Sequence, residues 1–418
     1  MGMLSFFAVL LGVCALFAYI NEKVLRLPAN IGLMLISLVC GGTIIVLHRF
    51  GIHFFFLEEV ALLSGIDFNR FLMKGLLCFL LFAGAITVPS GTLLKKKWSV
   101  AMLALLATVI SAALVGGFAY LIFALVGAPV ALVTAMIFGS IICPTDPIAA
   151  IAILVPIGLP PKIETLINGE SLFNDGVGVV LFTTFTALAS HSHEAGPVVL
   201  FLREVAGGLG LGAVFGLLTV FFLRGIRENT TALLITLAAV TGCYAIGLAL
   251  VVSGPIATVV LGLIVGGHFE SRGHQDMVVG KARDFWHFLD NILNAVLFVL
   301  LGLQVLDLSW SRAAIVALVP MIPAILASRW LSVAAAIYLL NLPHRSRIRH
   351  LPLINLLTWT GMRGGLAVAL ALSLDPSLGR NLLLNVTFGV VAFSILVQGL
   401  TVKAFFPARV LRGISREV

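Results

Sequence analysis

The chain has 418 residues, of which 60% are hydrophobic and only 11% are charged, and its mean hydropathy is +1.14. A soluble protein of this length needs far more charge to cover its surface, so this class is excluded. Apolar runs of about 20 residues, enough to cross the hydrocarbon core of a bilayer, recur along the whole chain. The sequence therefore predicts an all-α polytopic membrane protein.

Thirteen membrane spans are predicted. In chain order they cover residues 3–20, 27–47, 71–91, 98–125, 130–155, 160–190, 198–223, 230–252, 254–270, 284–305, 311–340, 352–374 and 381–406. The first run lacks the basic segment and the small-residue cleavage site of a signal peptide, so it is counted as a span. The five cysteines lie within apolar runs, and no disulfide framework is expected.

The basic residues predict which side of the membrane each connection faces. Eighteen of the 26 Lys and Arg residues fall in alternate connections and the C-terminal tail, while Arg329 and Arg363 lie within spans. Since positive charge marks the cytoplasmic side, the C-terminus is expected inside and the N-terminus outside a prokaryotic-type inner or plasma membrane. The net charge of +8 is thereby explained as a topology signal and a contact with membrane lipids, not as a nucleic-acid site.

An odd number of spans predicts an inverted repeat. If spans 1–6 repeat as spans 8–13, the two halves have opposite orientations, which is the plan of many secondary transporters. Helix breaks should then fall at corresponding spans. Span 5 carries "CPTDP" at 143–147 and its partner, span 12, carries "GMRGG" at 361–365, both in the middle of apolar sequence.

The break in span 5 predicts an ion site. Pro144 and Pro147 lack backbone donors and restrict the residues before them, so Thr145 and Asp146 should lie in a short extended segment. Carbonyl, hydroxyl and carboxylate oxygens would then meet, as a hard monovalent cation requires. A proline kink used only for packing is the alternative, but a carboxylate within the membrane is costly and favours function.

The break in span 12 surrounds a charge. Gly361, Gly364 and Gly365 permit an unwound or closely packed backbone around Arg363. A guanidinium in this apolar setting needs a buried acidic partner or several carbonyl groups.

Span 6 contains the polar stretch "NGESLFNDGV" at 168–177. At about 100° per residue, Ser171 and Asp175 share one helix face, whereas Glu170 points about 140° away from Asp175. Asp175 is therefore expected to face a cavity at the span 5 break, and Glu170 to neutralise Arg363. An aspartate removed from water favours its protonated form, while a cation beside it favours the ionised form. Proton and cation should thus compete for one carboxylate, which couples their movement.

The motifs "PTDP" at 144–147, "ESLFND" at 170–175 and "GMRGG" at 361–365, with "FWHFLDNILNAVLFVLLGLQ" at 285–304, resemble those of the NhaP/NHE-type monovalent cation/proton antiporters. The resemblance covers nearly the whole chain and implies an antiporter fold of the NhaA-like type, with two inverted six-helix repeats and discontinuous crossing helices. It also implies a homodimer. Within the single antiporter domain 1–418, a core bundle (98–190 and 311–406) would move against an interface part (1–91 and 198–305).

By matching positions, the resemblance implies a cation site formed by Asp146, Ser171, Asp175 and the Thr145 carbonyl. It implies a structural ion pair between Glu170 and Arg363, with Asn174 supporting the unwound segment. The Asn174–Asp175 pair resembles the electroneutral branch, which implies one cation exchanged for one proton. One position departs from the family: Ala83 stands where several members carry a cation-binding glutamate, so a water or a different ion preference is expected there.

Electroneutral Na⁺/H⁺ exchange is accordingly the favoured function, with no enzymatic activity and no cofactor besides the transported Na⁺ (or K⁺ or Li⁺) and H⁺. K⁺/H⁺ exchange on the same fold is the alternative. An intramembrane aspartyl hydrolase using Asp146 and Asp175 is less favoured, because the buried Arg363 and the matched breaks fit transport better. A channel, which would conduct without coupling to protons, is the third class.

Overall fold

The computed structural model describes residues 3–50, 72–190, 196–273, 277–341 and 351–417. These residues form helices joined by short connections and contain no β-strand, which confirms the all-helical fold class. The helices are α1 (Met3–Ile20), α2 (Ala29–Arg49), α5 (Leu77–Thr87), α6 (Ser90–Lys95), α7 (Lys97–Ala101), α8 (Thr108–Leu125), α9 (Leu132–Ile142), α10 (Ile148–Leu154), α11 (Pro161–Ala189), α12 (Pro197–Leu223), α13 (Asn229–Ala249), α14 (Gly254–Arg272), α15 (Met277–Leu303), α16 (Arg312–Asn341), α17 (Leu351–Thr360), α18 (Gly365–Leu372), α19 (Arg380–Phe393), α20 (Gly399–Phe405) and α21 (Ala408–Glu417).

Within the described residues, ten helices are long and apolar enough to cross a membrane, or eleven if the bent pair α17–α18 is one span. The other two predicted spans, 71–91 and 130–155, coincide with the shorter apolar helices α5, α9 and α10. Each predicted range therefore contains helix, but the count of thirteen and the inverted repeat remain predictions. The side of the membrane that each connection faces also remains a prediction, because two of the connections, 51–71 and 342–350, lie outside the described residues.

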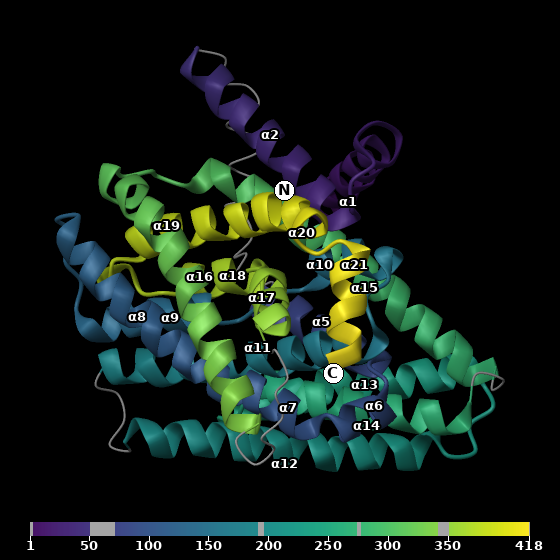
Figure 1. Cartoon of the computed structure of the whole chain (residues 1–418). Helices are drawn as coiled ribbons and strands as arrows, with labels where there is room; N and C mark the ends of the chain where they lie inside the picture. Colours follow the sequence, from purple (N-terminus) through teal and green to yellow (C-terminus); the bar gives the residue numbers. More distant parts are fainter. Residues whose placement is uncertain (1–2, 51–71, 191–195, 274–276, 342–350, 418) are drawn as a thin grey trace.

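Both predicted helix breaks are present. Helix α9 ends at Ile142 and α10 begins at Ile148, while α17 ends at Thr360 and α18 begins at Gly365 after a bend of 53°. The two breaks touch, since the backbone N–H of Asp146 donates to the Met362 carbonyl at 2.7 Å. Figure 1 shows α17 and α18 near the middle of the molecule, surrounded by the longer helices. Polar backbone at this depth is tolerated because the neighbouring protein satisfies it.

Apolar side chains form two main clusters. The smaller one joins α5, α12, α13 and α14 to the first half of α15, and the fully buried Trp286 lies at its centre against Phe82. The larger cluster joins α8–α11 to α16–α20 and also includes residues of α1 and α2. This grouping resembles the expected division into core and interface parts only in outline, because residues of α1, α2 and the second half of α15 also belong to the larger cluster. The division itself remains a prediction.

Candidate functional site

The extended peptide between α9 and α10 is held by Arg363. Its Nη1 atom donates to the carbonyl oxygens of Cys143 and Pro144, at 2.8 and 3.1 Å. Because the prolines remove helical donors from this region, carbonyl groups here need other partners, and the guanidinium supplies them. The span 12 break thus stabilises the span 5 break through a side chain as well as through the backbone.

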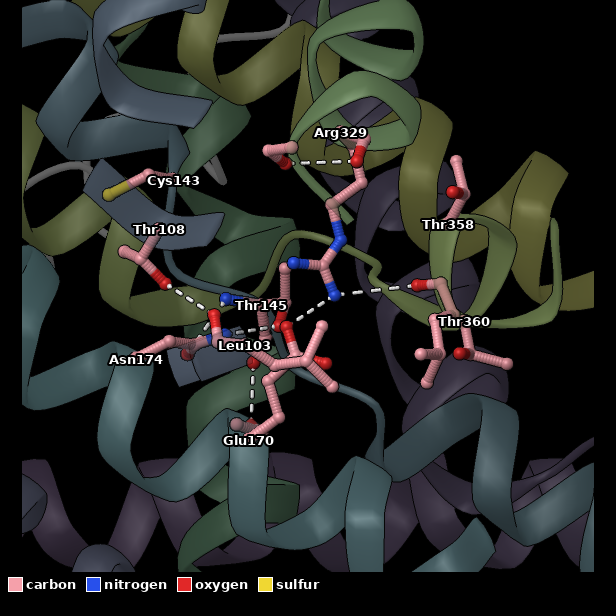
Figure 2. A network of polar contacts seen from close by, with 12 residues as sticks. Leu103, Thr108, Cys143, Thr145, Glu170, Asn174, Arg329, Thr358 and Thr360 are labelled. Atoms are coloured by element: carbon pink, nitrogen blue, oxygen red, sulfur yellow. Dashed lines mark hydrogen bonds and ion pairs between the residues drawn. The ribbon is translucent and has the colours of Figure 1, made fainter. Parts of the chain in front are cut away.

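Thr145, at the centre of this peptide, is clamped by α11. Ser171 Oγ donates to the Thr145 carbonyl at 2.6 Å, and Asn174 Nδ2 donates to Thr145 Oγ1 at 2.6 Å. The Thr145 N–H donates in return to Asn174 Oδ1 at 3.3 Å. Figure 2 shows Asn174 and Thr145 lying next to each other beside the buried arginine of α16. Asn174 is fully buried, so this reciprocal pair holds the peptide conformation inside the helix bundle.

Asp146 and Asp175 line one cavity of about 190 Å³. Asp146 Oδ1 accepts a hydrogen bond from the N–H of Ile148, the first residue of α10, at 3.0 Å. The cavity wall also includes Thr145, Ser171 and Gly364. All four predicted cation-binding residues therefore surround the same space, although they come from two different helical regions.

Gly364 allows the close approach of the two breaks. A Cβ atom added at this position would lie 2.6 Å from the Asp146 carboxylate oxygen Oδ2. We expect Gly364→Ala to displace Asp146, to lower stability by about 1–3 kcal/mol through overpacking and to reduce transport. Gly210→Ala on α12 is the matched control, because a Cβ there meets nothing within 4 Å. Thermal unfolding of both purified variants checks this, and equal stability would contradict the packing argument.

Glu170 pairs with an arginine other than the expected one. Its Oε1 lies 2.5 Å from Arg329 Nη2, and both side chains are 2% exposed. Figure 2 shows Arg329 reaching from α16 toward Glu170 on α11. The predicted pairing of Glu170 with Arg363 is therefore wrong for this structure, because Arg363 is engaged by the carbonyl groups of the span 5 break. Glu170 does point away from the cavity that Asp175 lines, as the helix geometry predicted.

Sequence reasoning missed Arg329 and the pair Asp290–Asn294. Arg329 is flanked by apolar residues within span 11. Like Arg363, it therefore needs a buried acidic partner or several carbonyl groups. Asp290 is near the start of the predicted span 284–305, where solvation is easy, but α15 begins at Met277 and places Asp290 at its middle. Asp290 and Asn294 line the same cavity as Asp146.

Ala83 does not line this cavity. It is 1% exposed and belongs to the smaller apolar cluster, next to Phe82. The residues of α5 that reach the cavity are Leu77, Leu80, Leu81, Gly84 and Thr87. The position beside Ala83, where the family resemblance implied a water or a different ion preference, is therefore not part of this cavity.

The site offers oxygen atoms rather than nitrogen or sulfur. Two carboxylates, a hydroxyl and a backbone carbonyl are the donors that hard cations prefer. Across the described ranges, no three His, Cys, Asp or Glu side chains converge as a multidentate metal site would require. Discontinuous helices that meet inside a bundle and carry intramembrane charges define the class of secondary ion transporters.

Comparison with known proteins gives the family. Residues 12–408 match the family described as "Sodium/hydrogen exchanger, transmembrane". The chain therefore belongs to this family of membrane transporters. It is 38% identical over 405 residues to the Na(+)/H(+) antiporter NhaP of Pseudomonas aeruginosa, covering 96% of this chain and 95% of that protein. It is 31% identical to the Na(+)/H(+) antiporter NhaH of Halobacillus dabanensis, covering 91% and 92%.

The fold is shared with a solved structure. The sodium proton antiporter MjNhaP1 from Methanocaldococcus jannaschii superimposes with a TM-score of 0.75 at 18% sequence identity. The match covers 100% of this chain and 99% of the other. At this identity the likeness describes the fold alone.

Proposed function

We propose that this protein is an electroneutral Na⁺/H⁺ antiporter that exchanges one Na⁺ for one H⁺ across the cell membrane by alternating access. The observation that carries the proposal is the shared cavity of Asp146 and Asp175 at the contact between two broken helices. Membership of the sodium/hydrogen exchanger family and the names of the similar proteins support it.

In this proposal Na⁺ is bound by Asp146, Ser171, Asp175 and the carbonyl oxygen of Thr145. The Ser171 hydroxyl and the Thr145 carbonyl are already 2.6 Å apart, joined by a hydrogen bond. Rotation of the hydroxyl hydrogen away from Thr145 would turn both oxygens toward one ion without moving the backbone. Asn174 holds the Thr145 peptide in place during the exchange of ligands.

The charged side chains in and next to the cavity support a stoichiometry of one to one. Arg329 and Arg363 are permanently positive, while Glu170, Asp146 and Asp175 are negative when ionised. The set therefore carries one net negative charge when all three carboxylates are ionised. One Na⁺, or one proton on Asp175, brings it to zero.

This balance supplies the coupling. Moving an uncompensated charge through the low-dielectric part of the membrane is costly, so the empty ionised site crosses rarely. Both occupied states are neutral and can cross. Exchange then follows from competition for Asp175, and no separate coupling device is needed.

The larger-scale features of the proposal come from the family resemblance. A core bundle of residues 98–190 and 311–406 would move against an interface part of residues 1–91 and 198–305, within a homodimer. The N-terminus would lie outside and the C-terminus in the cytoplasm, with the basic tail near membrane lipids. Cysteine crosslinking across α11 and α12, which pack together, in the presence and absence of Na⁺ tests the movement.

An assay in proteoliposomes that enclose a pH-sensitive dye identifies the transported ion. External Na⁺, Li⁺ or K⁺ is added in turn. We expect addition of Na⁺ to raise the internal pH reported by the dye, because protons leave as Na⁺ enters. A response to K⁺ without a response to Na⁺ or Li⁺ would replace this proposal with K⁺/H⁺ exchange. Absence of any cation-dependent proton movement would leave the aspartyl hydrolase, which also needs two aspartates in one cavity, or an uncoupled channel.

Competition predicts a characteristic pH dependence. In the acidic range, where the unliganded Asp175 is mostly protonated, each Na⁺ must displace one proton. The apparent KM for Na⁺ should therefore rise about tenfold for each unit of decrease in pH, while the maximal rate changes little. Initial rates measured over a Na⁺ series at several pH values check this. A KM that does not depend on pH would contradict the shared carboxylate.

A further inference from the structure

Asp290 is a third carboxylate in the cavity, and the proposed exchange mechanism does not use it. It projects from the middle of α15, whereas the proposed cation ligands come from α11 and from the break between α9 and α10. Asp290 and Asn294 nevertheless line the same cavity as Asp146 and Asp175. An ionisable side chain at this depth of a membrane protein calls for a functional explanation.

The position of Asp290 is set by its own helix. Trp286, Asp290 and Asn294 are spaced four residues apart and so lie on one face of α15. Trp286 is fully buried against Phe82, and its indole N–H donates to Thr236 Oγ1 at 3.2 Å, which anchors this face. One turn beyond Asp290, Asn294 Nδ2 donates to Asp290 Oδ1 at 3.0 Å. The carboxylate is thus held at the cavity by residues on both sides.

Asp290 has no direct ion-pair partner among the residues that the structure describes. Among the described residues, no Lys, Arg or His side chain forms an ion pair with it, and only one of its oxygens accepts a hydrogen bond. His287, one turn earlier, is exposed, and its ring nitrogen is bonded to Asn291 at 3.2 Å. Glu170, by contrast, has Arg329 as its partner. Asp290 is therefore available to interact with a cation in the cavity.

We infer that Asp290 recruits and retains the incoming monovalent cation before Asp146 and Asp175 bind it. This rests on the proposed antiport function. A negative group on the wall of a cavity with apolar surroundings raises the local concentration of cations. Since α15 belongs to the proposed interface part and contributes none of the ligands, the charge of Asp290 does not move with the core bundle and is not counted in the site that becomes neutral on occupation. Its removal should weaken the capture of the ion and leave the crossing step nearly unchanged.

The inference is tested by comparing Asp290→Asn with Asp284→Asn in proteoliposomes. Asp284 is exposed on the same helix and does not line the cavity, so it controls for a general loss of charge. We expect Asp290→Asn to raise the KM for Na⁺ by ~3- to 10-fold at low ionic strength and to leave the maximal rate within about twofold. The difference from wild type should shrink as ionic strength increases, because salt screens the recruiting charge. Asp290→Glu, which keeps the charge, should restore most of the affinity.

A purely structural role would give a different pattern. If Asp290→Asn lowers the maximal rate or the melting temperature while KM and its salt dependence stay as in wild type, the inference is overturned. Equal KM values for Asp290→Asn and Asp284→Asn also overturn it, and the antiport proposal then stands. Failure of the wild-type protein to exchange any of Na⁺, Li⁺ or K⁺ for protons would instead contradict the antiport proposal. Asp290→Ser provides the same comparison if the Asn variant does not fold.

Discussion

Asp175→Asn is expected to abolish cation/proton exchange while the protein remains folded. Asparagine has nearly the same shape, so the packing of α11 is preserved, but its amide can neither release a proton nor balance a bound cation. Even at an effective dielectric constant of about 20, contact between a cation and a carboxylate contributes several kcal/mol. Transport should therefore fall at least about 100-fold. Asp175 lines the cavity together with Asp146 and Ser171, and in the proposed mechanism it is the carboxylate shared by both ions.

The measurement is Na⁺-driven proton movement in proteoliposomes containing equal amounts of protein. Asp284→Asn, on the exposed side of α15, is the control and should transport at the wild-type rate. Thermal unfolding in detergent should give similar midpoints for both variants. Undiminished exchange by the Asp175 variant would remove the basis of the mechanism.

Removing one partner of the Glu170–Arg329 pair is expected to reduce the amount of folded protein sharply. Both side chains are 2% exposed, so Glu170→Ala leaves a buried guanidinium without its partner, and Arg329→Ala leaves a buried carboxylate. The expected cost is about 3–5 kcal/mol for either change. Arg312→Ala, at the exposed start of the same helix, should have little effect. Yield of monodisperse protein and thermal unfolding report the difference.

A double-mutant cycle identifies which arginine is coupled to Glu170. The double variant of Glu170 and Arg329 should lose clearly less stability than the sum of the single variants, because neither charge is then stranded. Arg363→Ala should also be destabilising, since the Cys143 and Pro144 carbonyl groups lose their donor. Its coupling energy with Glu170 should be smaller. A larger coupling of Glu170 with Arg363 than with Arg329 would contradict the pairing seen in the structure.

Features that depend only on residues close together along the chain could be predicted from the sequence. Length and hydropathy predict the spans, and the proline and glycine motifs predict the breaks that lie between Ile142 and Ile148 and between Thr360 and Gly365. Helical periodicity also predicts that Asp175 and Glu170 point in different directions, toward the cavity and away from it. These properties follow from backbone chemistry and from the angle between residues of one helix, so no knowledge of other helices is required.

Only the tertiary structure decided which helices face one another. Arg329 and Arg363 look alike in the sequence, since each is an arginine in the middle of an apolar span. The packing of α11, α16 and the span 5 break assigns Glu170 to Arg329. The packing of α15 on α5 decides that Asp290 reaches the cavity and that Ala83 does not. Periodicity gives the direction of a side chain relative to its own helix axis. The partner it meets depends on how separate helices pack, and in an apolar bundle many alternative packings satisfy the same hydrophobic pattern.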